Sequence, residues 1–409
     1  MTAPSQTWLD LPAATGFGVD NLPYGVFSDA SGRRRTGVAI GDHVLDLAAA
    51  TGDDGHATGS LNAFLARGPR AWADLRAQLT AWVTDGVHRD RVEPHLLPRD
   101  AVTLHLPVEV ADYVDFYSSR HHAENLGRMF RPDSAPLTPN WQHLPIGYHG
   151  RSGTVAVSGT PVLRPSGQRR APADDAPTFG PSQRLDIEAE VGFVVGAPSD
   201  LGRPVPLGGF AEHVFGVCLL NDWSARDLQA WEYVPLGPFL GKSFLTSVSP
   251  WVVPLAALEA ARVPPPARDV PLLPYLDDAG ADPWGLDLAI EVRLNGELVS
   301  RPPFGLMYWT PAQQLAHMTV NGASLRTGDL FASGTVSGPE RDQRGSFIEL
   351  SWGGREPLTL ADGSTRTFLE DGDEVTLTAT APGTAGGRIA LSEVTGRVLP
   401  SPPPVGGAR

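Results

Sequence analysis

Apolar residues along this chain recur mostly in short runs broken by glycine and proline, a pattern that favours many short strands over long helices. In the first hundred residues we expect strand-like pieces around Tyr24–Phe27 and Thr36–Asp46. After the Gly68-Pro69 break, large apolar residues recur at helical spacing and predict a helix: Trp72, Leu75, Leu79 and Trp82. Residues 1–105 are therefore expected to form a small β-rich module with a helical appendage.

The region 106–400 is rich in valine, threonine and leucine, and connections such as 263–266 (Val-Pro-Pro-Pro) separate its strand-like segments. The final part, Thr365–Leu399, reads as strands joined by turns at Asp371-Gly372 and Gly386-Gly387. Residues 401–409 contain three consecutive prolines and are expected to be a frayed tail. The sequence predicts a mainly β protein with a larger second domain.

Composition narrows the class of protein. The chain has 409 residues with 32 basic and 46 acidic side chains, a net charge of −14, which argues against nucleic-acid binding. A single cysteine excludes a disulfide framework and a cysteine-rich zinc site. We find neither a membrane-length apolar run nor a signal peptide, so we expect a soluble cytoplasmic protein with no membrane partner. Lys242 is the only lysine, and such a survivor can mark a position that requires a compact ammonium group.

The first candidate for chemistry is the strictly alternating stretch Leu185–Val191, which places Asp186, Glu188 and Glu190 on one face of a strand. One interpretation is a half-buried strand with a solvated acidic side. The other is a set of hard oxygen ligands for Mg²⁺ or Ca²⁺. The apolar run that follows, 191–195, favours the metal, because unpaired carboxylates beside buried backbone are costly.

A second candidate begins where the apolar run 217–220 ends. Asp222, Arg226 and Gln229 have the i, i+4, i+7 spacing of one helical face, although an N-cap with a helix salt bridge explains the same pattern. Lys242 lies in an apolar stretch nearby, where a charge usually has a partner. The tripeptide Gly241-Lys242-Ser243 is not a phosphate loop, because only three residues separate its glycine from Gly237.

A third candidate is the polar segment Asp115–Asn125. Asp115 could join a cluster of hard metal ligands. His121 and His122 are consecutive, so at most one of them is expected to face a site. A lone histidine is more often structural. A neutral imidazole beside a metal-bound substrate would, however, suit a general base.

Together these stretches resemble the fumarylacetoacetase family. The resemblance extends over about 240 residues in the family's order: Asp112–Asn125, Leu144–Arg151, Leu185–Glu190, Asn221–Ser243, Gly328–Gly338 and Phe347–Trp352. The long run Asn221–Ser243 is the most specific of them. The wider superfamily shares only the glutamate pair, the aspartate and the lysine, so the long runs point to the branch that carries the family's name.

The resemblance assigns roles residue by residue. It implies four ligands of a divalent cation, Mg²⁺ or Ca²⁺, with two further residues near the metal: Asp115, Glu188, Glu190 and Asp222, then Lys242 and Thr246. It implies that His122 is the general base and that Glu349 orients it. It implies that three groups stabilise the oxyanion and bind substrate: Arg226, Gln229 and Lys242. Further substrate contacts are implied at Tyr117, Arg131, Tyr148, Tyr233 and Thr335.

The resemblance also implies a fold and a reaction. The expected fold is a small N-terminal SH3-like β-barrel domain over 1–105, followed over 106–400 by a large catalytic domain built as a mixed β-sandwich or β-roll, with the protein assembled as a homodimer. The expected reaction is hydrolytic cleavage of a carbon–carbon bond in 4-fumarylacetoacetate, a dianionic diketo acid, to fumarate and acetoacetate in tyrosine and phenylalanine degradation.

Two alternatives stay open. One is a related metal-dependent hydrolase, hydratase or decarboxylase of another 2-oxo acid, such as an acylpyruvate; the other is a β-rich binding module that has lost activity. The sequence also departs from the family at two positions. His121 stands where another polar residue is more usual, and Leu245 replaces a smaller residue beside Thr246.

Overall fold

The computed structural model describes residues 6–12, 15–171, 173–384 and 386–403. Strands dominate these residues and form a thirteen-stranded sheet, a five-stranded sheet and four two-stranded ribbons. The predicted mainly β fold is therefore confirmed. Of the tail predicted at 401–409, residues 401–403 are in neither helix nor strand, and 404–409 lie outside the described residues.

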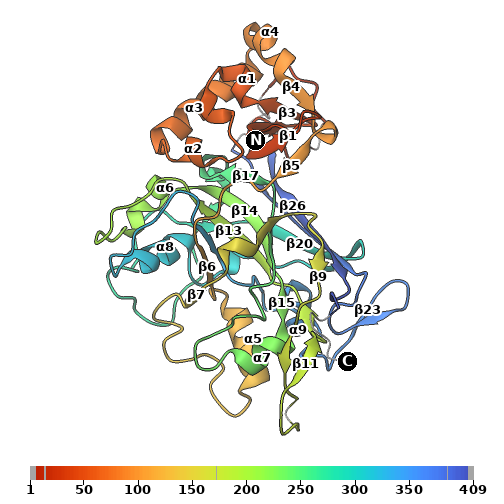
Figure 1. Ribbon diagram of the computed structural model, residues 1–409. Coiled ribbons are helices and arrows are strands. Elements are labelled where there is room, and N and C mark those ends of the chain that lie inside the picture. Colours follow the sequence, from red (N-terminus) through yellow and green to blue (C-terminus); the bar gives the residue numbers. More distant parts are fainter. Residues whose placement is uncertain (1–5, 13–14, 172, 385, 404–409) are drawn as a thin grey trace.

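The large sheet runs through both halves of the chain (Figure 1). In spatial order its main path is β4 (Leu96–Pro98), β3 (His43–Asp46), β2 (Arg34–Ile40), β1 (Tyr24–Ser28), β17 (Trp251–Pro254), β14 (Val214–Asp222), β13 (Ala189–Val195), β22 (Leu330–Ala332), β6 (Tyr113–Phe116) and β7 (Gly147–His149). Three more strands join it from the side: β5 (Thr103–His105), β8 (Val155–Val157) and β16 (Thr246–Val248).

The five-stranded sheet has the order β21 (Glu297–Ser300), β20 (Ala289–Leu294), β25 (Glu374–Pro382), β26 (Arg388–Leu399) and β9 (Val162–Leu163). The ribbons pair β10 (Ser166–Arg169) with β11 (Thr178–Pro181), β12 (Leu185–Asp186) with β15 (Ser224–Ala225), β18 (Arg262–Val263) with β19 (Gly285–Leu286), and β23 (Leu358–Thr359) with β24 (Thr365–Arg366). The α-helices are α1 (Leu47–Thr51), α2 (Asn62–Leu65), α3 (Pro69–Thr84), α4 (Arg89–Val92), α5 (Arg120–Phe130), α6 (Phe210–His213), α7 (Arg226–Glu232), α8 (Pro311–Thr319) and α9 (Phe347–Leu350).

The N-terminal elements gather at one end of the molecule (Figure 1). The predicted strand pieces are present, with the second split into β2 and β3 by a turn at Gly41, whose φ of 54° suits glycine. The predicted helix is α3, which buries its four regularly spaced apolar residues. The SH3-like barrel is not confirmed: β1 pairs with β17, at Tyr24↔Val252, so these strands extend the large sheet along an open path.

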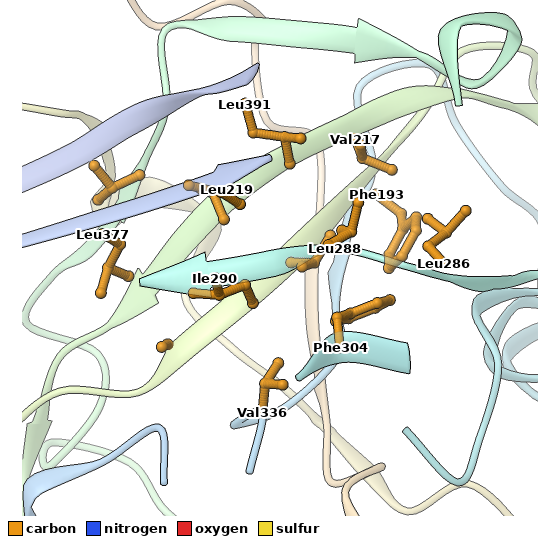
Figure 2. Close-up of a cluster of buried hydrophobic side chains, with 14 of the residues drawn as sticks. Phe193, Val217, Leu219, Leu286, Leu288, Ile290, Phe304, Val336, Leu377 and Leu391 are labelled. Carbon is orange, nitrogen blue, oxygen red and sulfur yellow. The ribbon is translucent and has the colours of Figure 1, made fainter. Parts of the chain in front are cut away.

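The two central strands, β13 and β14, are buried on both faces. Phe193 and Val217 point into one hydrophobic core, where they meet Ile290 and Leu377 of the five-stranded sheet (Figure 2). Val194 and Cys218 point to the opposite side, into the core shared with the N-terminal helices. Burial on both faces explains why both strands read as continuous apolar runs. None of the helices in the described ranges combines the length and apolar character needed to cross a membrane.

Candidate active site

Four acidic residues meet where neighbouring strands of the large sheet lie side by side. Asp115 belongs to β6, and Asp222 is the last residue of β14. Glu188 lies just before β13, and Glu190 is the second residue of that strand. Each offers a carboxylate oxygen, and these oxygens lie within 4.8 Å of one another. All four side chains are buried. The structure thus brings together the four residues for which the resemblance implied a metal site.

The carboxylate cluster is short of hydrogen-bond donors. Asp115 Oδ1 and Glu190 Oε1 are buried without a hydrogen-bond partner. Burial raises the pKa of Asp115, and the negative charge of Asp222 raises it further; burial and Asp115 do the same to the pKa of Glu190. Orphaned carboxylate oxygens at this spacing fit a hard divalent cation such as Mg²⁺ or Ca²⁺, which binds oxygen ligands and would favour the ionised forms.

Asp186 is not part of the carboxylate cluster, contrary to the prediction that strict alternation places it on the same face as Glu188 and Glu190. The strand is interrupted at 187–188, and Asp186 ends the short strand β12. Its carboxylate instead forms a salt bridge with Arg226, with Oδ2 2.8 Å from the guanidinium Nε. Side chains alternate between two faces only along one continuous strand, and here the break separates Asp186 from Glu190.

Lys242 lies against one side of the carboxylate cluster. Its ammonium group donates to Glu188 Oε2 at 2.5 Å and to Asp222 Oδ2 at 2.9 Å. Thr246 and Tyr148 also donate to Asp222, at 2.8 and 3.2 Å. Together with Asp222 and Lys242 they line a small cavity of about 90 Å³. Burial disfavours the ammonium ion, but Asp222 and Glu188 outweigh burial and raise the pKa of Lys242.

Glu188 is the best-compensated member of the carboxylate cluster. Burial opposes its ionisation, yet Lys242 and Arg226 hold the pKa of Glu188 well below its usual range. Arg226 Nη1 lies 2.8 Å from Glu188 Oε1. The one lysine of the chain therefore lies between two carboxylates, those of Glu188 and Asp222.

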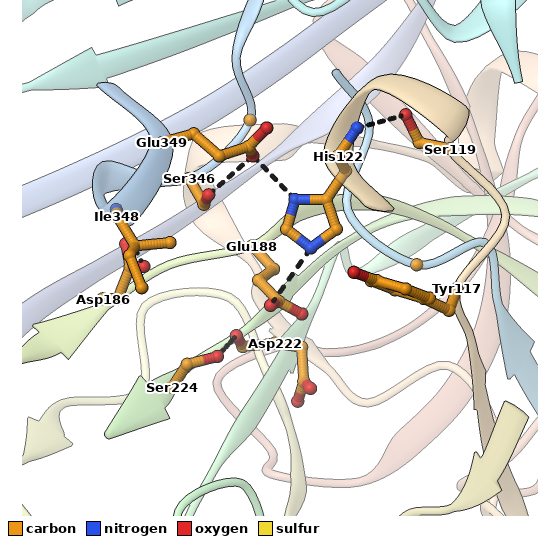
Figure 3. Close-up of polar contacts among 12 residues, drawn as sticks. Tyr117, Ser119, His122, Asp186, Glu188, Asp222, Ser224, Ser346, Ile348 and Glu349 are labelled. Atoms are coloured by element: carbon orange, nitrogen blue, oxygen red, sulfur yellow. Dashed lines mark hydrogen bonds and ion pairs between the residues drawn. The ribbon is translucent and has the colours of Figure 1, made fainter. Parts of the chain in front are cut away.

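His122 approaches the carboxylate cluster from helix α5 (Figure 3). Ser119 caps this helix by accepting from the backbone N–H of His122 at 3.3 Å. His122 Nδ1 is 2.7 Å from Glu349 Oε2, and Nε2 points towards Glu188 Oε1 at 4.0 Å. Burial opposes ionisation of Glu349, but His122 and neighbouring donors lower its pKa. Three further side chains donate to this carboxylate: Asn125, Ser337 and Ser346.

Helix α7 carries Arg226 and Gln229 into the site. The helix begins at Arg226, so Asp222 does not share a helical face with these residues as the spacing predicted; it belongs to the preceding strand β14. Arg226 Nη1 donates to Gln229 Oε1 at 3.1 Å. Arg226 Nη2 is buried and has no hydrogen-bond partner. The arrangement leaves one guanidinium N–H₂ group available to a bound molecule.

The other expected substrate contacts surround this centre at different depths. The Tyr117 ring meets His122 edge-on, with centroids 5.4 Å apart, and Thr335 is buried with its hydroxyl unpartnered. Burial raises the pKa of Tyr117, and the charges of Glu349 and Glu188 raise it further, while Arg131 and Arg226 partly oppose that rise. Arg131 itself is exposed and donates to Pro136 O. Tyr233 is half exposed, on the loop after α7.

The two residues that depart from the family pattern, His121 and Leu245, both lie beside residues of the site. His121 is half-buried, and it is His122 that hydrogen-bonds Glu349. Leu245 packs in the hydrophobic core of the central sheet, whereas its neighbour Thr246 turns to Asp222. Sequence reasoning missed the parts played by Asn125, Ser337 and Ser346. Asn125 lies in a segment already singled out for its polar density, but the two serines carry no local signal.

Two family models and several curated proteins match this chain. Residues 20–107 match the family model described as fumarylacetoacetase N-terminal, and residues 112–390 match the model described as fumarylacetoacetate (FAA) hydrolase C-terminal. The chain is similar to the fumarylacetoacetase of Homo sapiens, at 47% identity over 94% of this chain and 96% of the relative. It is also similar to the fumarylacetoacetase of Arabidopsis thaliana, at 43% identity over 97% of this chain and 99% of the relative.

Solved structures share the fold at low sequence identity. The fumarylacetoacetate hydrolase of psychrophilic Exiguobacterium antarcticum superposes with a TM-score of 0.55 at 19% identity, covering 93% of this chain and 99% of that one. The 5-carboxymethyl-2-hydroxymuconate delta-isomerase of Mycobacterium smegmatis gives a TM-score of 0.51 at 16% identity, covering 93% of this chain and 100% of that one.

Removing one carboxylate should weaken cation binding. Glu190→Gln keeps the side-chain shape but loses a charged oxygen ligand, so we expect Mg²⁺ and Ca²⁺ affinity to fall by at least about 10-fold. Isothermal titration calorimetry of wild type and variant measures this. Glu349→Gln is the matched control, because Glu349 is equally buried but contacts His122 rather than the carboxylate cluster. Equal losses in both variants, or none in Glu190→Gln, would contradict the assignment of the cation site.

Proposed function

The chain belongs to the fumarylacetoacetate hydrolase family, and from this premise we propose that it is a fumarylacetoacetase, hydrolysing a carbon–carbon bond of 4-fumarylacetoacetate to give fumarate and acetoacetate. The observation that carries the proposal is the meeting of two devices in one buried site. A carboxylate cluster suited to a divalent cation lies 4.0 Å, measured to Glu188, from a histidine that is backed by a carboxylate.

The reaction explains why these groups occur together. Hydrolysis of a carbon–carbon bond releases a carbanion, which leaves readily only as an enolate, and a 1,3-diketone provides one because its second carbonyl accepts the charge. A divalent cation held by Asp115, Glu188, Glu190 and Asp222 would supply Lewis-acid polarisation of the diketone oxygens. Mg²⁺ or Ca²⁺ is the cation we propose, because all four ligands are carboxylates.

His122 is the proposed general base. A hydrogen bond from Nδ1–H to Glu349 leaves the lone pair of Nε2 free, and Nε2 faces the carboxylate cluster. His122 removes a proton from water, and the resulting hydroxide adds to the ketone carbonyl next to the scissile bond. Glu349 holds the ring in one orientation and stabilises the imidazolium that forms.

Three groups are proposed to stabilise the tetrahedral oxyanion: Arg226, Gln229 and Lys242. Arg226 Nη2 has an unused donor in a buried site, where a charge-assisted hydrogen bond is strong. As the adduct collapses, the carbon–carbon bond breaks, fumarate leaves as the carboxylate product, and a proton returns to the enolate carbon to complete acetoacetate. Tyr117, Tyr148, Thr335, Tyr233 and Arg131 are proposed to contact the rest of the substrate.

The charge of the protein makes local positive groups necessary. The substrate is a dianion and the chain carries −14, so arginine and lysine side chains must offset repulsion at the site itself. Arg226 and Lys242 are buried there, and Arg131 lies at the exposed side. We further propose, from the resemblance, a cytoplasmic homodimer acting in tyrosine and phenylalanine degradation. The division into domains at 105/106 is also a proposal, supported by the two family models meeting between 107 and 112.

The purified protein should consume fumarylacetoacetate in the presence of Mg²⁺ or Ca²⁺. The measurement is loss of the substrate's ultraviolet absorbance, with fumarate and acetoacetate identified as products. Chelation of the cation should stop the reaction, and readdition should restore it. Efficient cleavage of acylpyruvates with no turnover of fumarylacetoacetate would reject the proposed substrate.

His122→Ala should lower turnover steeply, because the proposed base that takes the proton from water is gone, while Mg²⁺ affinity stays nearly unchanged. General-base removal of this kind costs on the order of 10²–10⁴-fold in kcat. The control is His121→Ala, which we expect to remain active because its neighbour His122 is the one bonded to Glu349. Collapse of cation binding in His122→Ala would mean that His122 is a ligand and would overturn its proposed role.

A further inference from the structure

Asp186 is a fully hydrogen-bonded carboxylate beside the site, although the proposed mechanism gives it no part. It is fully buried, and both of its oxygens accept hydrogen bonds. Oδ1 accepts from the backbone N–H groups of Ile187 at 2.8 Å and Phe347 at 2.6 Å. Oδ2 accepts from Arg226 Nε at 2.8 Å and from the N–H of Ile348 at 3.1 Å. All four of these partners are donors, so each oxygen of Asp186 is used as an acceptor.

These bonds join three separate elements. Asp186 ends β12, Arg226 begins α7, and Phe347 and Ile348 begin α9, the short helix that carries Glu349 (Figure 3). The pairing Asp186↔Ser224 brings β12 beside the segment that leads into α7. One carboxylate therefore holds the helix that supplies the oxyanion donor and the helix that supplies the partner of His122.

The guanidinium group of Arg226 is fixed on two of its three nitrogens. Asp186 takes Nε, and Glu188 with Gln229 takes Nη1. Nη2 has no partner although the side chain is only 4% exposed. A planar group held at two nitrogens presents the third in a set direction, which is the preorganisation that an oxyanion donor requires.

We propose that Asp186 is a positioning residue that orients Arg226 so that Nη2 is presented to the oxyanion of the substrate. The inference rests on the proposed function and deepens it. In Asp186→Asn an amide of the same shape replaces the carboxylate; its NH₂ group would face other donors, so at least one of the four bonds to Asp186 is lost, and Arg226 loses its charged partner at Nε.

The test is steady-state kinetics on the Mg²⁺-loaded protein in a double-mutant cycle with Arg226→Gln. We expect Asp186→Asn to lower kcat by about 10- to 100-fold with Mg²⁺ affinity retained, as is typical when the partner that orients a functional group is removed. In the Arg226→Gln background the same change should have little further effect, because the group it positions is gone.

Asp373→Asn is a matched control. Asp373 is a buried aspartate that accepts from Arg366 Nε, Arg366 Nη2, Asn295 and the N–H of Glu370, a set of donors closely like that around Asp186, but it stands outside the site. This variant should lose stability and keep wild-type kcat. If Asp186→Asn lowers kcat by the same factor with and without Arg226, or not at all, its role is only structural and the proposal is wrong.

A second measurement uses the wild-type protein and does not depend on the variant folding or on turnover. In a crystal structure with Mg²⁺ and malonate, a 1,3-dicarbonyl dianion, Arg226 Nη2 should contact a malonate oxygen while Nε stays on Asp186. An Arg226 that leaves Asp186 to meet the ligand, or an Nη2 that makes no contact with it, would overturn the proposal. A wild type that binds malonate in the expected way but does not hydrolyse fumarylacetoacetate would instead reject the proposed function.

Discussion

Four carboxylates buried within 4.8 Å of one another are the constraint on which the rest of the site depends. Two like charges at that distance repel by roughly 3 kcal/mol even at an effective dielectric constant of 20, and burial adds a desolvation cost for each group. Lys242, which bonds Glu188 and Asp222, and Arg226, which bonds Glu188, supply two positive charges against four negative ones. All four carboxylates can therefore be ionised together only if a divalent cation supplies the remaining positive charge.

The fold meets this constraint by ending apolar strands at one place. β13 and β14 are held by cores on both faces, so the residues at their ends cannot move away from one another. The charged groups around these strand ends are distributed unevenly among the four carboxylates. Glu188 has Lys242 and Arg226, whereas Asp115 and Glu190 keep bare oxygens. The cationic side chains thus contact only part of the carboxylate cluster. His122 lies beside the cluster, and its Nδ1 is bonded to Glu349.

Much of this arrangement could be predicted from the sequence, because it follows from local patterns and a long motif. The alternation of apolar and acidic residues identified Glu188 and Glu190 as candidate ligands. Lys242 stood out because it is the only lysine of the chain. The prediction for Asp186 was wrong because the strand breaks at 187–188. The break depends on the pairing of β12 with β15, which is a contact between segments distant in the sequence. Ser337 and Ser346, which bond Glu349, were beyond prediction for the same reason.

The continuation of the N-terminal strands into the large sheet was likewise hidden from sequence reasoning. β1 meets β17 more than two hundred residues away, and nothing in the local pattern at Tyr24 indicates which edge it will pair with. Single-strand periodicity identifies faces, but the partner of a strand is decided by tertiary packing.

The proposed function requires the four carboxylates to be ionised ligands of one divalent cation. A crystal structure of the protein grown with Mn²⁺, whose anomalous scattering identifies the ion, tests it most directly. We expect a single anomalous peak about 2.0–2.4 Å from one oxygen of each of the four carboxylates, those of Asp115, Glu188, Glu190 and Asp222. A cluster holding only water, or an ion bound elsewhere while these carboxylates hydrogen-bond to one another in protonated form, would contradict it.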